Sequence, residues 1–390
     1  VETNCQNCGF QQVRINGLDG PYTQILIDSR PVFSALSGVY GLEQIPASMI
    51  ERVEVMRGGG SALFGSSAIA GTINIITKEP LRNSGQLSHT ITSIGGSSAF
   101  DNNTSLNASL VTDDHRAGLY IFGQNRYRSG YDYDGDGFTE LPKLKNQTVG
   151  FRSYLKTSTY SKLTFEYHHM QEFRRGGDML NRPPHEAHIA EQLQHSIDGG
   201  SLKFDYFSPD EKNRLSVFAS AANTDRDSYY GPGNDPLKAY GKTTDLTAMG
   251  GAQYVHTFDK CFFMPSDLTA GLEYNRDRLK DNMWGYNRHT DQTVNIYSAF
   301  LQNEWKNDRW GILIGARLDK HNMVDNVIFS PRANLRFNPT QNINLRLSYS
   351  SGFRAPQAFD EDMHIENVGG TVAMIERAKD LKEEKSQSFS

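Results

Sequence analysis

The 390-residue chain has few cysteines, few prolines and no long apolar run. Its three cysteines, Cys5, Cys8 and Cys261, are too few for a disulfide scaffold. No stretch approaches the length of about 18 apolar residues that a membrane helix needs, which excludes a helical membrane protein. A membrane β-barrel is not excluded, because barrel strands show lipid only every second residue. The formal net charge of −5 lacks the basic character of nucleic-acid-binding proteins, so we expect no nucleic-acid partner.

Motifs of catalysis and nucleotide binding are also missing from the sequence. There is no G-x-x-x-x-G-K-[ST], G-x-G-x-x-G, G-x-S-x-G or H-E-x-x-H. The pair His185 and His188 has its second histidine one position too early for the zinc helix pattern. Three glycines at 58–60 are better explained by a tight turn than by a phosphate cradle. We therefore predict that the protein is not an enzyme and requires no cofactor.

The first 80 residues have the pattern of a small α+β unit. Residues 24–28, Gln-Ile-Leu-Ile-Asp, have the apolar centre of a buried strand, and residues 50–56 alternate between apolar and charged. Small residues at 61–69 favour a helix, and residues 71–77 predict another strand.

From about residue 84 onward, one strand pattern follows another. Residues 343–350 alternate strictly between apolar and polar side chains, and residues 163–167 and 202–206 do the same. Successive side chains of a strand point to opposite faces, so each segment has one apolar and one polar face. We predict roughly thirteen strands of about 10–15 residues and the start of another at 386–390, where the chain ends as a fragment would.

The connections between these strands alternate between short and long, as in an outer-membrane barrel with periplasmic turns and longer outer loops. A large soluble β-protein is the alternative, but it has no reason to sort its loops by length. An α+β unit that precedes such a barrel suggests a plug in its lumen. The predicted short turns are 112–116, 157–162, 208–213, 259–267, 306–309 and 338–342, and the long loops are 128–147, 173–195, 225–245, 276–292, 319–329 and 350–385.

Residues 50–78 resemble the plug signature of TonB-dependent outer-membrane receptors. They begin Ile-Glu-Arg-Val-Glu-Val-Met-Arg-Gly-Gly-Gly and end Gly-Thr-Ile-Asn-Ile-Ile-Thr-Lys. Upstream, residues 26–31 read Leu-Ile-Asp-Ser-Arg-Pro, similar to the family's plug strand except that Ser29 stands where glycine is usual. Residues 352–356, Gly-Phe-Arg-Ala-Pro, resemble a barrel motif of the family.

The resemblance implies a mainly β protein, a transmembrane antiparallel barrel of 22 strands with an internal plug. Residues 1–80 would be the C-terminal part of the plug and residues 84–390 the N-terminal part of the barrel, with 13 to 14 strands present. The TonB box and the first plug strand would precede Val1, and the other strands would follow Ser390.

The implied function is energised import across the bacterial outer membrane. The partners would be the lipid bilayer, TonB with its inner-membrane energising complex, and a scarce metal chelate such as an iron–siderophore or cobalamin. The alternatives are a glycan or peptide importer of the same family, which usually works with a surface lipoprotein, and a passive porin-like or adhesin-like barrel.

Candidate site residues fall into two sets. Plug tips and aromatic outer loops are expected to contact the ligand, and plug charges are expected to meet charges on the barrel wall, as in the family. The predicted ligand contacts are Asp28, Arg30, Phe33, Tyr40, Tyr229, Tyr230, Trp284 and Tyr286, and the predicted plug–barrel ion pairs involve Glu51, Arg52, Glu54 and Arg57.

Asp132, Asp134 and Asp136 alternate with other residues and are followed by Gly137, like the first half of a calcium loop. Position twelve is Lys143 rather than glutamate, so the loop is not a complete EF-hand. Cobalamin receptors of the family carry calcium-binding aspartates in this region. The motif therefore has two interpretations: a Ca²⁺ site in an outer loop, or a solvated turn without an ion.

Overall fold

One antiparallel sheet of 14 strands dominates the computed structural model, and its strands lie in chain order from β6 to β19. The structure describes residues 2–5, 10–15, 17–18, 20–29, 46–58, 60, 65, 68–232, 239–358, 363–365, 372–378 and 380–390. No helix in this part of the chain is long and apolar enough to cross a membrane. The mainly β, antiparallel architecture predicted from the alternating pattern is confirmed.

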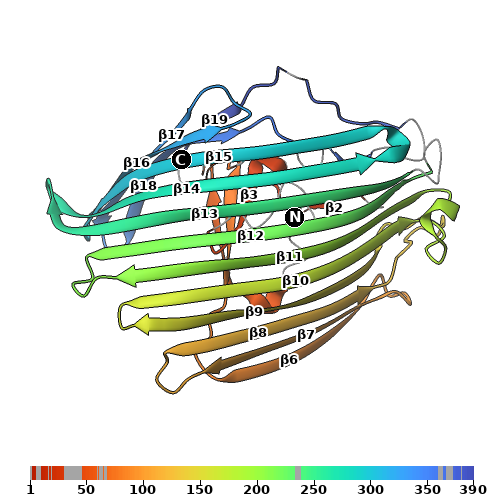
Figure 1. Ribbon diagram of the computed structural model, residues 1–390, viewed down its shortest axis with the longest axis horizontal. Helices are drawn as coiled ribbons and strands as arrows, with labels where there is room; N and C mark the ends of the chain where they lie inside the picture. The colour runs from red at the N-terminus through yellow and green to blue at the C-terminus, as the bar shows by residue number, and fades with distance from the viewer. Residues whose placement is uncertain are drawn as a thin grey trace.

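The strands of this sheet are joined by hairpins, and each pairs with its neighbours in sequence (Figure 1). They are β6 Ser84–Ser93, β7 Phe100–Val111, β8 Ala117–Arg128, β9 Lys143–Ser158, β10 Ser161–Gly177, β11 Ala190–Phe207, β12 Asn213–Gly231, β13 Tyr240–Cys261, β14 Met264–Met283, β15 Arg288–Lys306, β16 Trp310–His321, β17 Ile328–Thr340, β18 Ile343–Arg354 and β19 Glu384–Phe389.

The outer face of the sheet carries an apolar belt. On β15 the belt includes Leu301, which is exposed and lies midway between Tyr297 and Trp305. Aromatic pairs border the belt at both ends: the rings of Tyr274 and Tyr297 lie 4.9 Å apart toward the long loops, and those of Phe263 and Trp305 lie 5.7 Å apart toward the short turns. An apolar band between two aromatic girdles is the surface that a membrane barrel presents to lipid.

Several strands are longer than predicted, and the long connections are correspondingly shorter. The predicted loop 225–245 shrinks to 232–239, because β12 continues to Gly231 and β13 begins at Tyr240. Beyond the belt the outward residues of β12 are polar, for example Asn223 and Asp225, so the apolar–polar alternation stops while the backbone pairing continues. The pattern therefore marks the end of the belt and not the end of the strand.

The N-terminal residues form a separate, smaller unit. The strands β3 (Thr23–Ile27), β4 (Ile50–Arg57) and β5 (Gly71–Thr77) make a three-stranded sheet in the order β3-β5-β4. A short hairpin, β1 (Glu2–Cys5) and β2 (Phe10–Gln12), and the single-turn 3-10 helices η1 (Gly20–Tyr22) and η3 (Ala47–Met49) precede β4. The helix expected at 61–69 lies largely outside the described residues.

This unit lies on the concave side of the large sheet, which curves around it (Figure 1). Its core residues Ile27, Met49 and Ile73 form one apolar cluster with Tyr120 and Phe122, two inward-facing residues of β8. The apolar belt faces away from the unit, and the sheet turns mostly polar side chains toward it. A plug inside the curve of a barrel wall, as predicted, is therefore the arrangement observed.

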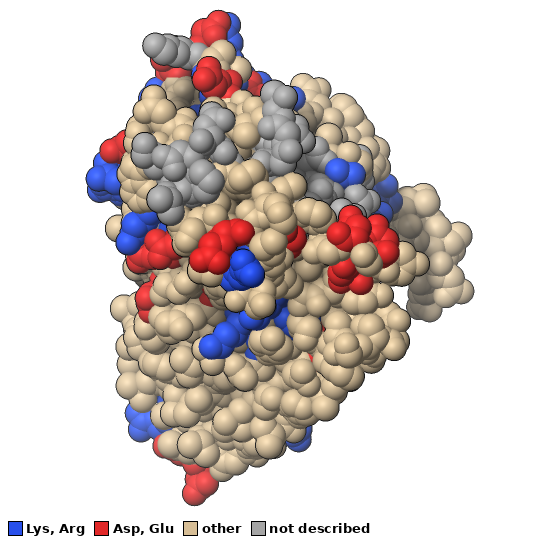
Figure 2. All heavy atoms as spheres, turned by 90° about the vertical axis from the view of Figure 1, so that its right-hand side faces the viewer, with Lys and Arg blue, Asp and Glu red and all other residues tan. Residues whose placement is uncertain are grey.

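The right-hand end in Figure 1 carries the longer connections, and the left-hand end carries the short turns. The predicted long loop 276–292 is an exception, because β14 continues to Met283 and β15 begins at Arg288, which leaves a four-residue turn that contains η6 (Trp284–Tyr286). Figure 2 shows the end with the long connections, where acidic and basic groups gather near the middle of the face and neither sign dominates.

Candidate functional site: the interface between plug and wall

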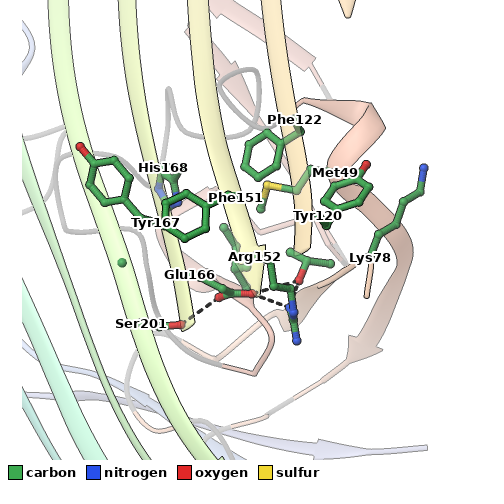
Figure 3. A pocket seen from close by; sticks show the side chains of 13 residues that line it. Met49, Lys78, Tyr120, Phe122, Phe151, Arg152, Glu166, Tyr167, His168 and Ser201 are labelled. Atoms are coloured by element: carbon green, nitrogen blue, oxygen red, sulfur yellow. Dashed lines mark hydrogen bonds and ion pairs between the residues drawn. The ribbon is translucent and has the colours of Figure 1, made fainter. Parts of the chain in front are cut away.

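Arg152 joins the plug to the wall. It projects inward from β9 and its Nη1 donates to Asp28 Oδ2 of the plug at 2.5 Å and to Glu166 Oε1 of β10, also at 2.5 Å. The same nitrogen donates to the Thr77 hydroxyl at the end of β5. Nη2 lies 3.3 Å from Glu79, two residues after the end of that strand. One guanidinium thus holds carboxylates from both units, and Figure 3 shows its contact with Glu166.

A second cation and two hydroxyls complete this cluster. Lys162 of β10 lies 3.1 Å from Glu79. Thr77 Oγ1 donates to Asp28 Oδ2 at 2.6 Å within the plug, and Ser201 of β11 donates to Glu166 Oε2 at 2.8 Å within the wall. Every carboxylate of the cluster therefore has a hydrogen-bond or ion-pair partner, as partly buried charges require.

An apolar layer lies directly beside these charges. Tyr120 and Phe122 from the wall pack against Met49 and Ile27 from the plug. They line a small cavity of about 30 Å³, and Figure 3 shows Met49 beside the two aromatic rings. The apolar side chains keep water away from one side of the ion pairs, which strengthens each interaction at this point.

The electrostatics at Asp28 follow from its two kinds of neighbour. Burial alone would raise the pKa of its carboxyl, but the charge of Arg152 and the hydrogen bonds from Thr77 outweigh burial and hold the pKa of Asp28 below its ordinary value. The backbone here is unusual, since Asp28 and Ser29 have φ of 49° and 65°. The left-handed conformation of Ser29 gives a physical reason for the glycine that the family usually has here.

Asp28 does not lie where the sequence placed it. It was expected at a plug tip that contacts ligand, whereas it contacts Arg152, six residues before the short-turn end of β9. Arg30, Phe33 and Tyr40, the other plug residues expected to contact ligand, lie outside the described residues.

The four plug charges predicted to pair with the wall form no such pair in the described parts of the chain. Arg52 and Glu54 pair with each other at 2.8 Å along β4, and both are well exposed. Glu54 also accepts a hydrogen bond from Asn74 of β5 at 3.2 Å. Glu51 and Arg57 lie exposed on the same strand. Asp28 and Glu79 make the contacts that were expected of these four.

Two of the aromatic residues predicted for outer loops lie at the end of a strand. Tyr229 and Tyr230 belong to β12 and are only 1% exposed, because the neighbouring connections cover this end of the sheet. Tyr286 donates its hydroxyl hydrogen bond to the backbone oxygen of Tyr230, so the structure brings these two together. Trp284 stands apart on η6 with about half of its surface exposed. Contact of these residues with ligand stays a prediction.

Asp132, Asp134 and Asp136 do come together. Their carboxylate oxygens lie within 4.8 Å of one another in the connection between β8 and β9, and all three side chains are exposed. They already accept hydrogen bonds from nearby backbone N–H groups, for example from Gly135 to Asp132 at 2.6 Å. Such a turn needs no ion for its geometry, so calcium binding here stays a prediction.

The residues that join plug and wall most directly were missed from the sequence. Arg152, Glu166 and Lys162 sit in strand patterns without a motif, and Glu79 follows the plug signature. Arg152 and Glu166 are directly opposite in the β9–β10 register, and Glu166 is opposite Ser201 in the next pair. The sequence could have indicated the contact between Arg152 and Glu166 only through the register of the β9–β10 hairpin. That register could not be predicted, because the ends of the two strands were uncertain.

Family models cover the whole chain. One described as TonB-dependent Receptor Plug Domain matches residues 1–72, and one described as TonB dependent receptor-like, beta-barrel, matches residues 72–390.

Curated relatives match most of this chain. The vitamin B12 transporter BtuB of Vibrio vulnificus is 23% identical over 365 residues, which are 89% of this chain and 54% of the relative. A ferric enterobactin receptor of Pseudomonas aeruginosa is 24% identical over 423 residues, 90% of this chain and 53% of the relative. The chain spans about half the length of the curated relatives it matches.

Solved structures show the same fold. The siderophore receptor PirA of Acinetobacter baumannii superposes with a TM-score of 0.79 at 18% identity, over 96% of this chain and 60% of that one. A ferric enterobactin receptor mutant of Pseudomonas aeruginosa in complex with enterobactin superposes with a TM-score of 0.74 at 18% identity, over 90% of this chain and 60% of that one. With a plug packed inside a curved antiparallel wall and both family models matched, the chain belongs to the TonB-dependent receptor family.

Proposed function

We propose that the chain is part of an outer-membrane receptor that imports a scarce metal chelate with energy supplied through TonB. The observation that carries this proposal is the plug held inside the wall by Arg152, Asp28 and Glu79. A passive pore has no need of such a plug. The apolar belt between two aromatic girdles supports a membrane location, and the long connections would face outward.

The contacts at Arg152 suit a plug that is released and reseated. When Asp28 leaves, it keeps its hydrogen bonds from Thr77, which belongs to the plug. Arg152 keeps Glu166, which belongs to the wall. Neither Asp28 nor Arg152 is left without a partner. Glu79 loses both Arg152 and Lys162, but its side chain is 38% exposed, so separation avoids the large cost of a buried, uncompensated charge. A pull on the plug from the short-turn end would therefore break this contact reversibly.

The cargo class rests on the relatives. One is named a vitamin B12 transporter, and others are named ferric enterobactin receptors or siderophore receptors. These ligands are metal chelates. We propose the same class for this chain, and binding rather than catalysis as its activity.

Growth of a strain that lacks the full-length gene tests the proposal. Different iron chelates and cobalamin are supplied one at a time, each as the sole source. We expect a growth defect on one of them, restored by the gene only when TonB is also present. Normal growth on every metal source with a defect on a glycan or peptide would favour the related importer instead. Solute flux through the purified protein in liposomes without TonB would favour a passive barrel.

A further inference from the structure

The lipid-facing side of the sheet carries a line of cations beyond the aromatic girdle that lies toward the longer connections. On β14 the outward residues continue past Tyr274 of that girdle as Arg276, Arg278 and Lys280. Outward residues follow one another about 7 Å apart along a strand, so these three charges form a column on one face. Residues just past the aromatic girdle of a membrane barrel lie among the lipid head groups.

The strands beside this column supply it with a single carboxylate. Each of β13, β14 and β15 is paired on both sides, so the register fixes the outward neighbours of every cation. They are Ala248, Leu246 and Thr244 on β13 and Asn295, Thr293 and Asp291 on β15. Asp291 lies 2.8 Å from Arg278. Arg276 and Lys280 are exposed and form no ion pair within the described residues.

The nearest acidic residue in the row of Lys280 on the other side is Asp225 of β12. It is opposite Thr244 of β13, which is opposite Lys280. Two strand spacings are about 10 Å, too far for an ion pair. The column therefore carries an excess of positive charge at the level of the lipid head groups.

A trough of small side chains lies beside Arg276 on the same outward face. The register row that holds Arg276 begins at Tyr167 of β10, and only small residues stand between these two large side chains. The next row toward the short turns holds two more small residues before Tyr274. The small residues are Gly200 on β11, Ala219 and Ala221 on β12, and Ala248 and Gly250 on β13.

The trough is a real hollow of the surface. Over β11 and β12 it encloses about 450 Å³ and is lined by Tyr167 and Leu202 as well as by the small residues of these strands. β11 to β14 lie side by side across the middle of Figure 1, far from both edge strands of the sheet. A lipid chain that enters the trough gains close contact with the backbone, which the bulky residues of the surrounding belt prevent.

We propose that Arg276, Arg278 and Lys280, together with this trough, bind a phosphorylated lipid of the outer leaflet. Arg276 borders the trough and donates to the phosphate, while the charges of Arg278 and Lys280 attract it. A guanidinium matches two phosphate oxygens at once, so a phosphate monoester is the head group that fits best. One acyl chain lies over the small residues. This site rests on the proposed function, which turns the longer connections outward.

The experiment is native mass spectrometry of the full-length receptor purified in detergent. The probe is phosphatidic acid, and phosphatidylcholine with the same chains is its counterpart without net charge. We expect the receptor to retain phosphatidic acid in preference to phosphatidylcholine, and added salt should weaken this retention. In the double variant R276Q/K280Q the affinity for phosphatidic acid should fall by about 30-fold, which corresponds to about 1 kcal/mol for each cation removed.

The matched control for the charges is K212Q/K306Q. These two lysines lie at the short-turn end and already pair with carboxylates, Lys212 with Asp259 at 2.5 Å and Lys306 with Asp267 at 2.6 Å. The control removes the same number of cations as R276Q/K280Q, yet it should retain phosphatidic acid as the wild type does.

A separate variant, A248F, tests the trough without removing a charge. A ring at Ala248 fills the trough beside Arg276, so the affinity for phosphatidic acid should fall by about 10-fold as the chain loses its contacts. A299F adds the same ring to the belt outside the trough, between Leu272 and Leu318, and should leave retention unchanged. Inorganic phosphate, which has no chain, should not displace the lipid at equal concentration.

Three results would overturn the lipid site: equal retention of the two lipids, equal retention of phosphatidic acid by R276Q/K280Q and the wild type, or its displacement by inorganic phosphate. A receptor dimer that A248F dissociates would also overturn it, because a second copy would then occupy the trough. Absent lipid selectivity with intact TonB-dependent growth would remove only the lipid site. Selectivity without TonB-dependent growth would contradict only the proposed import.

Discussion

Arg152 links more charged groups than any other residue described at the plug–wall interface. Its side chain is mostly buried, and it is within ion-pair distance of Asp28, Glu79 and Glu166. Three carboxylates that share one cation repel each other as soon as that cation is removed. The free energy at stake is therefore that of three anions left at a partly dry interface, rather than that of one ion pair.

Replacement of this residue by glutamine is expected to destabilise the full-length receptor. R152Q keeps much of the side-chain volume but removes the charge, and we expect the free energy of unfolding to fall by about 3–5 kcal/mol, as for a broken buried pair. The measurement is equilibrium denaturation in urea.

The matched control for R152Q is R52Q on β4. Arg52 pairs only with Glu54, and both side chains are well exposed, so the free energy of unfolding should change by less than about 0.5 kcal/mol. Equal effects of R152Q and R52Q would show that the interface at Arg152 does not hold the plug.

The lowered pKa of Asp28 predicts how the stability of the folded protein changes with pH. Its pKa is lowered in the folded protein, so its contribution to stability is present above the ordinary value near 3.8 and is lost as the pH falls through the lower folded value. The stability difference between wild type and D28N should therefore be constant from about pH 5 to 8 and shrink below about pH 4. Thermal unfolding at a series of pH values measures it, and a difference that grows in acid would contradict the assignment.

At the scale of elements, the plug sheet depends on a close approach between β4 and β5. Arg57 and Gly71 are paired at one end of these strands. A Cβ atom on Gly71 would lie 2.4 Å from the backbone oxygen of Met56, a neighbour that cannot rotate away. The glycine is thus required by packing rather than by backbone conformation.

G71A should accordingly cost about 1–3 kcal/mol in free energy of unfolding, the range for overpacking. Gly85 of β6 provides the matched control, because an added Cβ there meets nothing within 4 Å. Urea denaturation of both variants decides the matter: an equal response would mean that β4 and β5 move apart without penalty.

For the whole molecule, the apolar belt predicts where a charge is tolerated. Leu301 lies at the middle of the belt, so L301R should destabilise the folded protein in bilayers by about 2–4 kcal/mol. Thr244 lies beyond the belt on β13, and T244R should cost about 0–1 kcal/mol. Folding into liposomes of defined thickness gives both values. A similar cost at the two positions would contradict the membrane placement.

The strands and the barrel wall could be predicted from the sequence, whereas the burial of individual side chains could not. Alternation along 343–350 identifies a strand with one apolar face, and the sorted loop lengths identify a barrel, because both follow from local chemistry. Tyr229 and Tyr230 were placed in a loop because the outward residues before them are polar. Their burial depends on the connections that cover them, which no local pattern records.

The sequence alone determined the family, the plug and the barrel wall, since side-chain periodicity and the plug signature are properties of neighbouring residues. Only the tertiary structure decided which charges meet. Arg152 reaches Asp28 across 124 positions, and Arg336 faces Arg346 across a hairpin, while the charges of β4 that stood out in the signature point elsewhere. An ion pair requires two side chains within about 4 Å, and that distance is set by register and curvature rather than by composition.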